Sequence, residues 1–417
     1  MVIPLTLISG AGFVLHRASG SYVWLVPLGF VLVQVCLSWS QRAATVTGRQ
    51  AEQLARLYVT VVVPCYNEDP AILDRTIYAL MVQTRQPDRV VVVDDGSLAN
   101  YDEVRYWWTV HSPTEFSWIQ QDNAGKKHAQ YAGFIASPEA DIFVTIDSDS
   151  ALAANALEEG LKPFADPKVM SVAGLETAYN LNKNVLTRMQ AMRTMVFQLF
   201  AMSAQSVAGG ATLINPGAFS LYRGHLIRQV ADAYIGETFF GIPVRIGDDT
   251  MLTLFALCAG KAVHQPTAAA FNVYPETLSH HLRQWIRWMR ASTIRTMWRL
   301  RYLPLRNYSW WFSFYQLWAY ITSIAVTVYI AAEWPWSAHL IKAGALALAL
   351  WPLAVSVRLV TISRSDMRWV DWVKGLLLLP VGALWYTLVL RQMRIYGAFT
   401  CDQQGWVTRD KVEVFGQ

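Results

Sequence analysis

Charged residues are scarce in this chain. They make up 16% of it, whereas soluble globular proteins carry roughly 25%. Hydrophobic residues reach 53% and the mean hydropathy is +0.24. This composition argues against an ordinary soluble protein and indicates a chain that lies only partly in water.

Paired cysteines and a secretion signal are also missing. The four cysteines are widely spaced, without a CxxC pair and without a histidine at metal-ligand spacing, which argues against a disulfide framework. We expect reduced thiols in the cytosol or the membrane. The first residues carry no basic segment, so no cleavable signal peptide is predicted.

Two apolar runs stand near the N-terminus, within residues 1–40. Residues 2–15 form a short run, and residues 21–39 form one that is long enough to cross a bilayer. Basic residues mark the cytosolic side of a span. They follow the second run at Arg42, Arg49 and Arg56. We therefore predict one span or a tight pair here, with the chain then entering the cytosol.

Residues 41–276 are predicted to form a cytosolic α/β domain. Apolar, β-branched runs at 58–64, 89–94 and 141–147 alternate with helical patterns at 70–83, 126–136 and 151–165. Strands that are apolar on both faces and lie between helices indicate a parallel-rich sheet covered on both sides.

Residues 277–306 carry no acidic residue but three tryptophans and seven arginines. The arginines are residues 283, 287, 290, 295, 299, 301 and 306. An Arg/Trp helix of this kind is typical of a membrane interface, while a solvated basic face or a nucleic-acid patch is the alternative. We favour amphipathic interface helices over 277–310, because apolar runs follow directly, and we expect no nucleic-acid partner.

Three more apolar runs, at 312–332, 339–360 and 371–390, occupy the predicted membrane segment 311–392. Basic residues flank both ends of the last run, and a full crossing cannot start and end on the cytosolic side. The last run also contains Pro380. We predict that it is re-entrant or interfacial, and that residues 393–417 form a cytosolic loop.

Polar motifs follow the first two predicted strands. Asp94 and Asp95 stand in VVVDDGS, and Tyr66 and Glu68 stand in VVVPCYNED. Ligands bind at the carboxyl ends of strands in open α/β sheets. The aspartates could therefore accept hydrogen bonds from a base or ribose, Tyr66 could cover the base, and Glu68 could reach its edge. The alternatives are a turn capped by Ser97 and a helix N-cap box.

The stretch DNAGKKHAQ at 122–130 combines a glycine with two lysines. Gly125 allows close backbone approach, and Lys126 or Lys127 supplies charge for a diphosphate. The alternative is a solvated loop.

The stretch TIDSDS at 145–150 places Asp147 and Asp149 two residues apart after a buried strand. Carboxylates at such spacing on a strand end point to one side. Together they offer the hard oxygen ligands that Mg²⁺ or Mn²⁺ prefers beside substrate phosphates. The metal would neutralise a departing diphosphate.

The stretch IGDDTMLT at 246–253 places Asp248 and Asp249 at the start of a predicted helix. An acidic pair there could simply complement the helix dipole. One carboxylate could instead deprotonate an acceptor hydroxyl, because displacement at a sugar carbon with inversion needs a base opposite the leaving group.

The stretch RQWIRW at 283–288 places Gln284, Arg287 and Trp288 on one helix face. The arginine could contact phosphates and the tryptophan could stack on a sugar ring. The alternative is a plain amphipathic membrane helix.

In this order, DDGS, DxD, GDD and QxxRW resemble the signature of family 2 glycosyltransferases of the processive membrane class. That class includes the cellulose, chitin and hyaluronan synthases and the nodulation chitooligosaccharide synthases. The resemblance runs from residue 58 to residue 409 and is greatest to hyaluronan synthases. NAGKKHAQ is similar to their NxGKRxA, GDDTMLT to their GDDRxLT, and the terminal RIYGAFTCDQQGWVTR to their segment ending in WGTR.

The resemblance implies a GT-A-type nucleotide-sugar domain and a role for each motif. Nucleotide-sugar contacts are implied for Tyr66, Glu68, Asp94, Asp95, Lys126, Asp147, Gln284, Arg287, Trp406 and Arg409. Metal ligation is implied for Asp149 and Asp147, and catalysis for the general base Asp249 with Asp248 beside it. Acceptor contacts are implied for Trp288, Gly217 and Arg223.

The chain departs from the family at two places. Residues 215–223 read NPGAFSLYR, with Asn215 and Ala218 at the Cys and Pro positions of the family's Cys-Ser-Gly-Pro-type stretch. Because that stretch lies near the acceptor sugar in the family, the change argues against hyaluronan as the product but not against a synthase. Val407 replaces glycine in the WGTR-like motif.

Three functions remain in competition. The first is a processive, UDP-sugar-dependent synthase in the plasma (inner) membrane, which extends a polysaccharide acceptor among membrane lipids. The second is a non-processive transferase that adds one sugar to a lipid carrier or glycan, and QxxRW argues against it. The third is a transporter, and the few charges in the apolar runs argue against it. A homopolymer synthase is the main variant of the first, and the oligomeric state is left open.

Overall fold

The computed structural model describes residues 25–332, 342, 352–362 and 367–403. The apolar run at 2–15, most of the run at 339–360, and the predicted site residues Trp406 and Arg409 lie outside the described residues.

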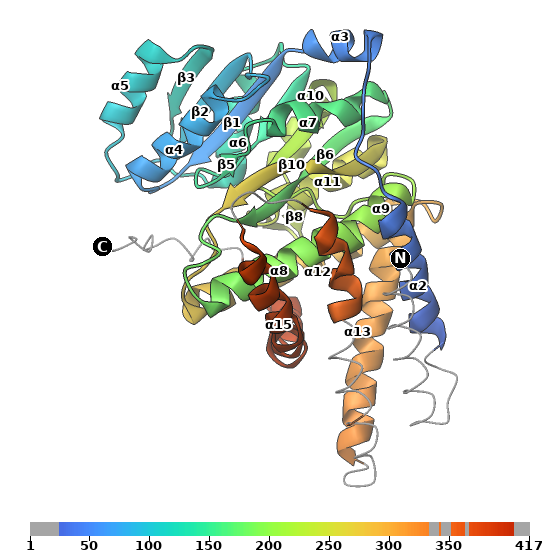
Figure 1. The fold of residues 1–417 in the computed structure, drawn as a ribbon. Coiled ribbons are helices and arrows are strands. Elements are labelled where there is room, and N and C mark those ends of the chain that lie inside the picture. The colour runs from blue at the N-terminus through green and yellow to red at the C-terminus, as the bar shows by residue number, and fades with distance from the viewer. Residues whose placement is uncertain (1–24, 333–341, 343–351, 363–366, 404–417) are drawn as a thin grey trace.

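The centre of the fold is an eight-stranded mixed sheet with the order β3-β2-β1-β4-β7-β6-β10-β5 (Figure 1). The strands are β1 (Val59–Cys65), β2 (Arg89–Asp94), β3 (Glu115–Gln120), β4 (Ile142–Thr145), β5 (Ala151–Leu152), β6 (Val169–Ala178), β7 (Ser220–Arg223) and β10 (Lys261–Asn272). β3, β2, β1 and β4 are parallel, β7 is antiparallel to β4 and to β6, and β6 is parallel to β10. The predicted α/β, parallel-rich sheet is confirmed.

Helices cover both faces of the sheet because alternate residues of each inner strand point to opposite sides. Val61 and Val63 of β1 pack with Leu73 of α4, whereas Val62 packs with Phe134 of α6. The helices of this part are α3 (Arg49–Ala55), α4 (Pro70–Met81), α5 (Asp102–His111), α6 (Lys126–Ile135), α7 (Ala156–Leu161), α8 (Val185–Phe197), α9 (Ser203–Val207), α10 (Gly224–Ile235) and α11 (Asp248–Ala259). The run at 151–165, predicted as one helix, is instead β5, α7 and a 3₁₀ turn, because Ala151–Leu152 pairs with β10.

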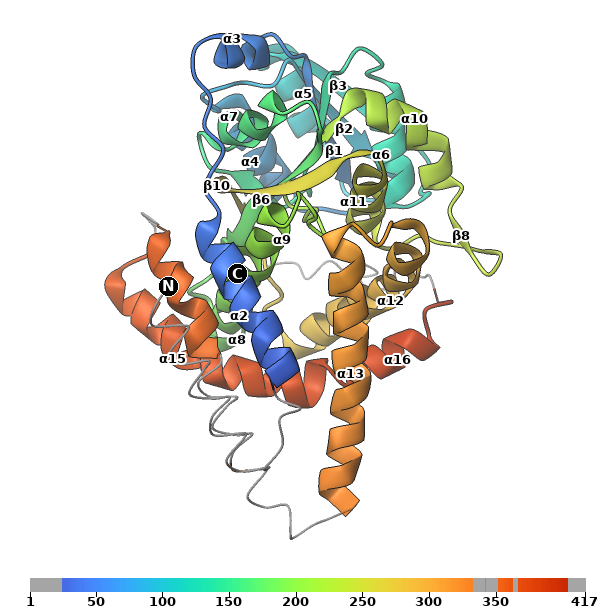
Figure 2. The same cartoon turned by 90° about the vertical axis from the view of Figure 1, so that its right-hand side faces the viewer.

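Below the sheet in Figure 1 lie α2 (Leu25–Ser40), α12 (Leu278–Tyr302), α13 (Tyr308–Ala332) and a helix from Trp369 to Phe399. This last helix is made of α15 (Trp369–Trp385), the π-helical turn η4 (Tyr386–Leu390) and α16 (Met393–Phe399). Figures 1 and 2 show α2 and α13 projecting from the same side of the sheet domain. In Figure 2 the helix from Trp369 to Phe399 runs crosswise to α13, and its last part packs against α12.

Among the described residues, the helix Trp369–Phe399 is the one that is long and apolar enough to cross a membrane, by length and composition. Pro380 lies inside it and does not end it. Leu28–Ser40 is a shorter apolar helix. A re-entrant or interfacial position of the run at 371–390 stays a prediction.

The basic segment forms a single helix, α12, but two of its arginines do not face a membrane interface or water. Arg295 is 0% exposed and Arg299 is 3% exposed. They are buried because α12 packs against α11 and α13. These two arginines therefore belong to the buried face of α12, and the membrane-interface position of the segment stays a prediction.

Candidate active site

The predicted motifs gather at one edge of the sheet. β1, β2 and β4 are parallel neighbours, so their carboxyl ends share that edge. Tyr66 and Glu68 follow β1, Asp94 ends β2, and Asp147 follows β4. This is the edge at which open α/β sheets bind ligands.

Lys126 joins two of the motifs directly. Its Nζ lies 2.5 Å from Asp147 Oδ1 and 3.0 Å from Asp248 Oδ2. Gln130, one turn further along α6, donates to Asp248 Oδ2 at 3.3 Å. The side chains of Lys126, Asp147 and Asp248 are 15%, 25% and 16% exposed, so a ligand can reach a cluster that is otherwise shielded from water.

Gly217 leaves space in front of this cluster. A Cβ at position 217 would lie 3.1 Å from Lys126 Nζ and 3.2 Å from Asp147 Oδ2. Any side chain there would crowd both groups. The segment 215–223 therefore brings bare backbone against the ion pair, at the position where the resemblance implies an acceptor contact for Gly217.

The Asp147–Asp149 segment is a turn. β4 ends at Thr145, and the Ser150 amide donates to the Asp147 carbonyl at 3.1 Å. The expectation that both carboxylates point to one side rested on extended backbone, and it does not apply to this geometry.

Glu68 holds that turn in place. Ser148, between the two aspartates, donates its hydroxyl to Glu68 Oε2 at 2.9 Å, and its carbonyl accepts from Thr76 Oγ1 at 2.8 Å. Glu68 is 6% exposed. The structure thus gives Glu68 a positioning contact to the acidic turn. The N-cap alternative for this stretch also holds, because Asp69 accepts from the first amides of α4.

Asp94 and Asp95 organise the loop before α6. Asp94 Oδ1 accepts from the Ser97 amide at 3.0 Å. Asp95 accepts from the amides of Ala124 and Gly125 at 3.0 and 2.8 Å. These bonds fix the approach of the chain to Lys126. A contact of either aspartate with a base stays a prediction, as does covering of the base by Tyr66, which is partly exposed at the end of β1.

Asp248 and Asp249, at the start of α11, have opposite pKa shifts. Burial and then the negative charge of Asp248 raise the pKa of Asp249 to about 7. Burial alone would also raise the pKa of Asp248, but the Lys126 ammonium holds it below the ordinary value. One carboxylate thus stays ionised while its neighbour titrates near neutral pH, which suits a general base.

Arg287 of the QxxRW motif acts on this pair, and the other motif residues lie on the same helix, α12. Arg287 is among the positive charges that lower the pKa of Asp248, and Gln284 is partly exposed. Trp288 is 43% exposed and meets Trp285 edge-on at 5.7 Å between ring centroids. Trp285 is buried, and its Nε1 donates to the Leu390 carbonyl at 2.8 Å. The motif therefore connects the acidic pair with the apolar helix Trp369–Phe399.

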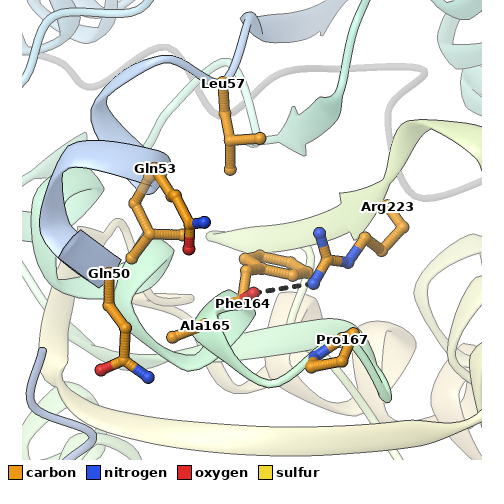
Figure 3. Close-up of a pocket in the computed structure, with 8 residues that line it drawn as sticks. Gln50, Gln53, Leu57, Phe164, Ala165, Pro167 and Arg223 are labelled. Atoms are coloured by element: carbon orange, nitrogen blue, oxygen red, sulfur yellow. Dashed lines mark hydrogen bonds between the residues drawn. The ribbon is translucent and has the colours of Figure 1, made fainter.

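Arg223 lies at the other end of the sheet. β7 is antiparallel to β4, so Arg223 pairs with Ile142 at the start of β4, whereas Asp147 follows its end. The guanidinium donates to the carbonyls of Val169 and Phe164 at 3.0 and 2.8 Å. It lines a separate pocket beside α3 (Figure 3). We therefore remove Arg223 from the predicted acceptor contacts.

Sequence reasoning missed Glu176 on β6. Burial and then the charge of Asp147 raise the pKa of Glu176 to about 7. Gln198 holds its backbone on both sides, donating to the Glu176 carbonyl and accepting from its amide at 2.8 Å each. A single acidic residue inside the apolar run 169–178 was the available signal. It belongs to no motif, so the sequence did not identify it.

The acidic turn suits a divalent cation. Asp147 and Asp149 supply hard carboxylate oxygens, and the absent Cβ of Gly217 keeps space beside Asp147 Oδ2. Within the described residues no three His, Cys, Asp or Glu side chains gather as a closed metal site. Mg²⁺ characteristically uses one or two carboxylates together with substrate phosphates, so two carboxylates are enough.

Known proteins resemble this chain over most of its length. Residues 55–291 match the family described as glycosyltransferase like family 2. The chain is 31% identical over 375 residues to a hyaluronan synthase of Streptococcus pyogenes, covering 86% of this chain and 84% of that protein. It is 34% identical over 237 residues to an N-acetylglucosaminyltransferase of Rhizobium meliloti, covering 56% and 55% of the two.

A solved structure confirms the GT-A-type fold. A mannosyltransferase from Pyrobaculum calidifontis, in complex with GDP-Man and Mn²⁺, superposes with a TM-score of 0.59 at 21% identity. The match covers 92% of this chain and 99% of that one.

Proposed function

The chain belongs to the glycosyltransferase-like family 2, and from that membership we propose that it is a membrane-embedded, inverting, processive synthase. It polymerises sugars from UDP-sugar donors and passes the polysaccharide out of the cell. The observation that carries the proposal is the pair Asp248 and Asp249, whose opposite pKa shifts provide an anchored carboxylate and a base near neutral pH at one ligand-accessible edge.

Donor binding uses the loop that Asp95 organises. Lys126, held between Asp147 and Asp248, supplies positive charge for the diphosphate. Asp147 and Asp149 would hold Mg²⁺ or Mn²⁺, which would stabilise the negative charge on the departing diphosphate. Tyr66 and Asp94 border the nucleotide side of the site, and Arg287 borders the phosphate side.

Transfer proceeds by displacement. Asp249 accepts the proton of an acceptor hydroxyl, and the hydroxyl oxygen forms a bond to the anomeric carbon of the donor sugar. The bond from that carbon to the diphosphate breaks on the opposite face, UDP leaves, and the configuration inverts. Trp288 offers an exposed aromatic face on which the acceptor sugar stacks.

The membrane helices give the product its path. α2, α13 and the helix Trp369–Phe399 lie on the side of the sheet domain that α12 covers, and they would sit among lipids with the catalytic domain in the cytosol. Trp285 ties the acceptor-side motif to this helix through its hydrogen bond to Leu390.

The test is synthesis by the purified protein in detergent or vesicles. UDP-glucuronate and UDP-N-acetylglucosamine are supplied separately and together with Mg²⁺ or Mn²⁺, and UDP release and product size are measured. A long product that requires both donors supports a hyaluronan-type synthase. Short products or single additions from every donor would contradict processivity.

A homopolymer synthase is the second candidate, and the acceptor side favours it. Residues 215–223 depart from the hyaluronan synthase pattern, and Gly217 of this stretch lies against Lys126 and Asp147. A long product from UDP-N-acetylglucosamine alone would establish this alternative.

A further inference from the structure

A buried ionic cluster lies beneath the acidic pair. Lys127 comes from α6, Glu237 from the link after α10, and Arg295 from α12. The side chains of Glu237 and Arg295 are 0% exposed and that of Lys127 is 4% exposed. Three charges from three separate elements thus meet away from water, next to the residues to which the transfer is assigned.

All three side chains of the cluster form hydrogen bonds or ion pairs. Arg295 binds both carboxylate oxygens of Glu237, with Nη2 at 3.0 Å from Oε2 and Nη1 on Oε1. Lys127 Nζ lies 2.5 Å from Glu237 Oε2 and donates to the Val244 carbonyl at 3.0 Å. The bidentate Arg–carboxylate contact fixes an orientation as well as a distance.

Arg295 also reaches the turn that presents the acidic pair. Its Nη2 donates to the Gly247 carbonyl at 3.1 Å, and its Nε donates to Thr250 Oγ1 at 3.3 Å. Gly247 has a φ of +72°, and a Cβ there would lie 2.9 Å from the Cβ of Ala291. The left-handed backbone and the close approach to α12 both require glycine.

One face of α12 lies along the turn at Gly247. Arg287, Ala291 and Arg295 are spaced by four residues and share a face. Arg287 acts on the charge of Asp248, Ala291 lies against Gly247, and Arg295 binds Gly247 and Thr250. Trp288 stands on the same helix. The position of α12 along the turn therefore sets the distance between the acceptor side and the acidic pair.

We propose that Lys127, Glu237 and Arg295 form a positioning cluster that fixes α12 relative to Asp248 and Asp249, so that the acceptor held on α12 meets the base. Apolar side chains could fill the same volume without the cost of desolvating three charges. The charged groups add a bidentate contact of fixed geometry, and this contact sets the position of α12 relative to the turn. This inference rests on the proposed function, in which Asp249 is the base.

The experiment compares Arg295→Met, Arg295→Lys and the double variant Glu237→Leu with Arg295→Met in the full-length protein. Arg301→Met, which removes an exposed charge from the same helix, is the control. We measure kcat, the KM for the donor, UDP binding and thermal unfolding. The double variant removes both members of the bidentate contact and leaves the Lys127 ammonium with the Val244 carbonyl alone, so thermal unfolding establishes that the variant is folded before its kcat is compared.

We expect Arg295→Met and the double variant to lose roughly 10- to 100-fold in kcat, as misplacement by about 1 Å does, with donor KM and UDP binding within about threefold of wild type. Arg295→Lys restores part of kcat, and Arg301→Met has no effect. A folded double variant with wild-type kcat would overturn this inference but not the proposed function. Wild-type protein that transfers no sugar from any donor would overturn the proposed function, and this inference with it.

Discussion

Replacing Asp249 by Asn should stabilise the protein as it removes the base. The pKa of Asp249 is raised from 3.8 to about 7. Between these values the folded protein keeps a proton that the unfolded chain has released. The wild-type carboxyl therefore contributes stability that is full below about pH 4 and is lost as the pH rises to about 7. The side-chain amide of the variant does not titrate and has no such dependence.

The size of the effect follows from the shift. Each pH unit in this window changes the free energy of unfolding by about 1.4 kcal/mol. From pH 5 to pH 7 the variant should gain at most about 3 kcal/mol relative to wild type, which corresponds to roughly 6–12 °C in Tm for a domain of about 200 residues. Above pH 7 the difference should level off.

Thermal unfolding followed by tryptophan fluorescence, from pH 5 to pH 8 without nucleotide, measures this difference. Asp248→Asn is the matched control. The lowered pKa of Asp248 means that its charge contributes stability across the whole range, so this variant should be destabilised. Its destabilisation should become smaller as the pH rises, because loss of the Asp248 charge also lowers the pKa of Asp249. A Tm difference for Asp249→Asn that does not change with pH would refute the raised pKa. Loss of UDP binding in that variant would refute its assignment as the base.

Three further predictions concern the neighbouring groups. Glu68→Ala should leave the buried Ser148 hydroxyl without its acceptor. This should lower the free energy of unfolding by about 1–3 kcal/mol and raise the Mn²⁺ concentration needed for half-maximal activity. Ser148→Ala should have a similar effect, and additive effects in the double variant would contradict the contact. Asp149→Ala should abolish the metal dependence of UDP binding in titration calorimetry, and an unchanged response would move the metal site elsewhere. Trp288→Ala should impair transfer to the acceptor more than donor binding, and the opposite pattern would rule out stacking.

Local features of this protein were predictable from the sequence because local physics determines them. β-branched runs specify β1 and β2, and the acidic and glycine-containing stretches mark strand ends. The pattern that predicts an amphipathic helix over 277–306 matches α12. The ordered motifs also predicted the family. Each element and each single motif depends on residues within a few positions of one another, whereas the family followed from the order of the motifs along the chain.

The tertiary structure decided what depends on distant contacts. The antiparallel direction of β7 moves Arg223 away from the site, and nothing in NPGAFSLYR states that direction. A turn held by Glu68 replaces the expected strand end at Asp147. Membrane crossing of the segments outside the described residues stays a prediction.

The partners and charge states of the ionisable groups also depend on distant contacts. Arg295 is one of seven arginines in a segment without acidic residues, and its partner Glu237 lies 58 positions earlier in the chain. Asp248 and Asp249 are adjacent and chemically identical, yet Lys126 lies against one of them only. The sequence by itself determined that Asp147, Asp248 and Asp249 stand in acidic motifs, but not that Glu176 lies near Asp147. Folding decided which of them stays ionised and which can accept a proton, because burial and the distance to a charge exist only in three dimensions.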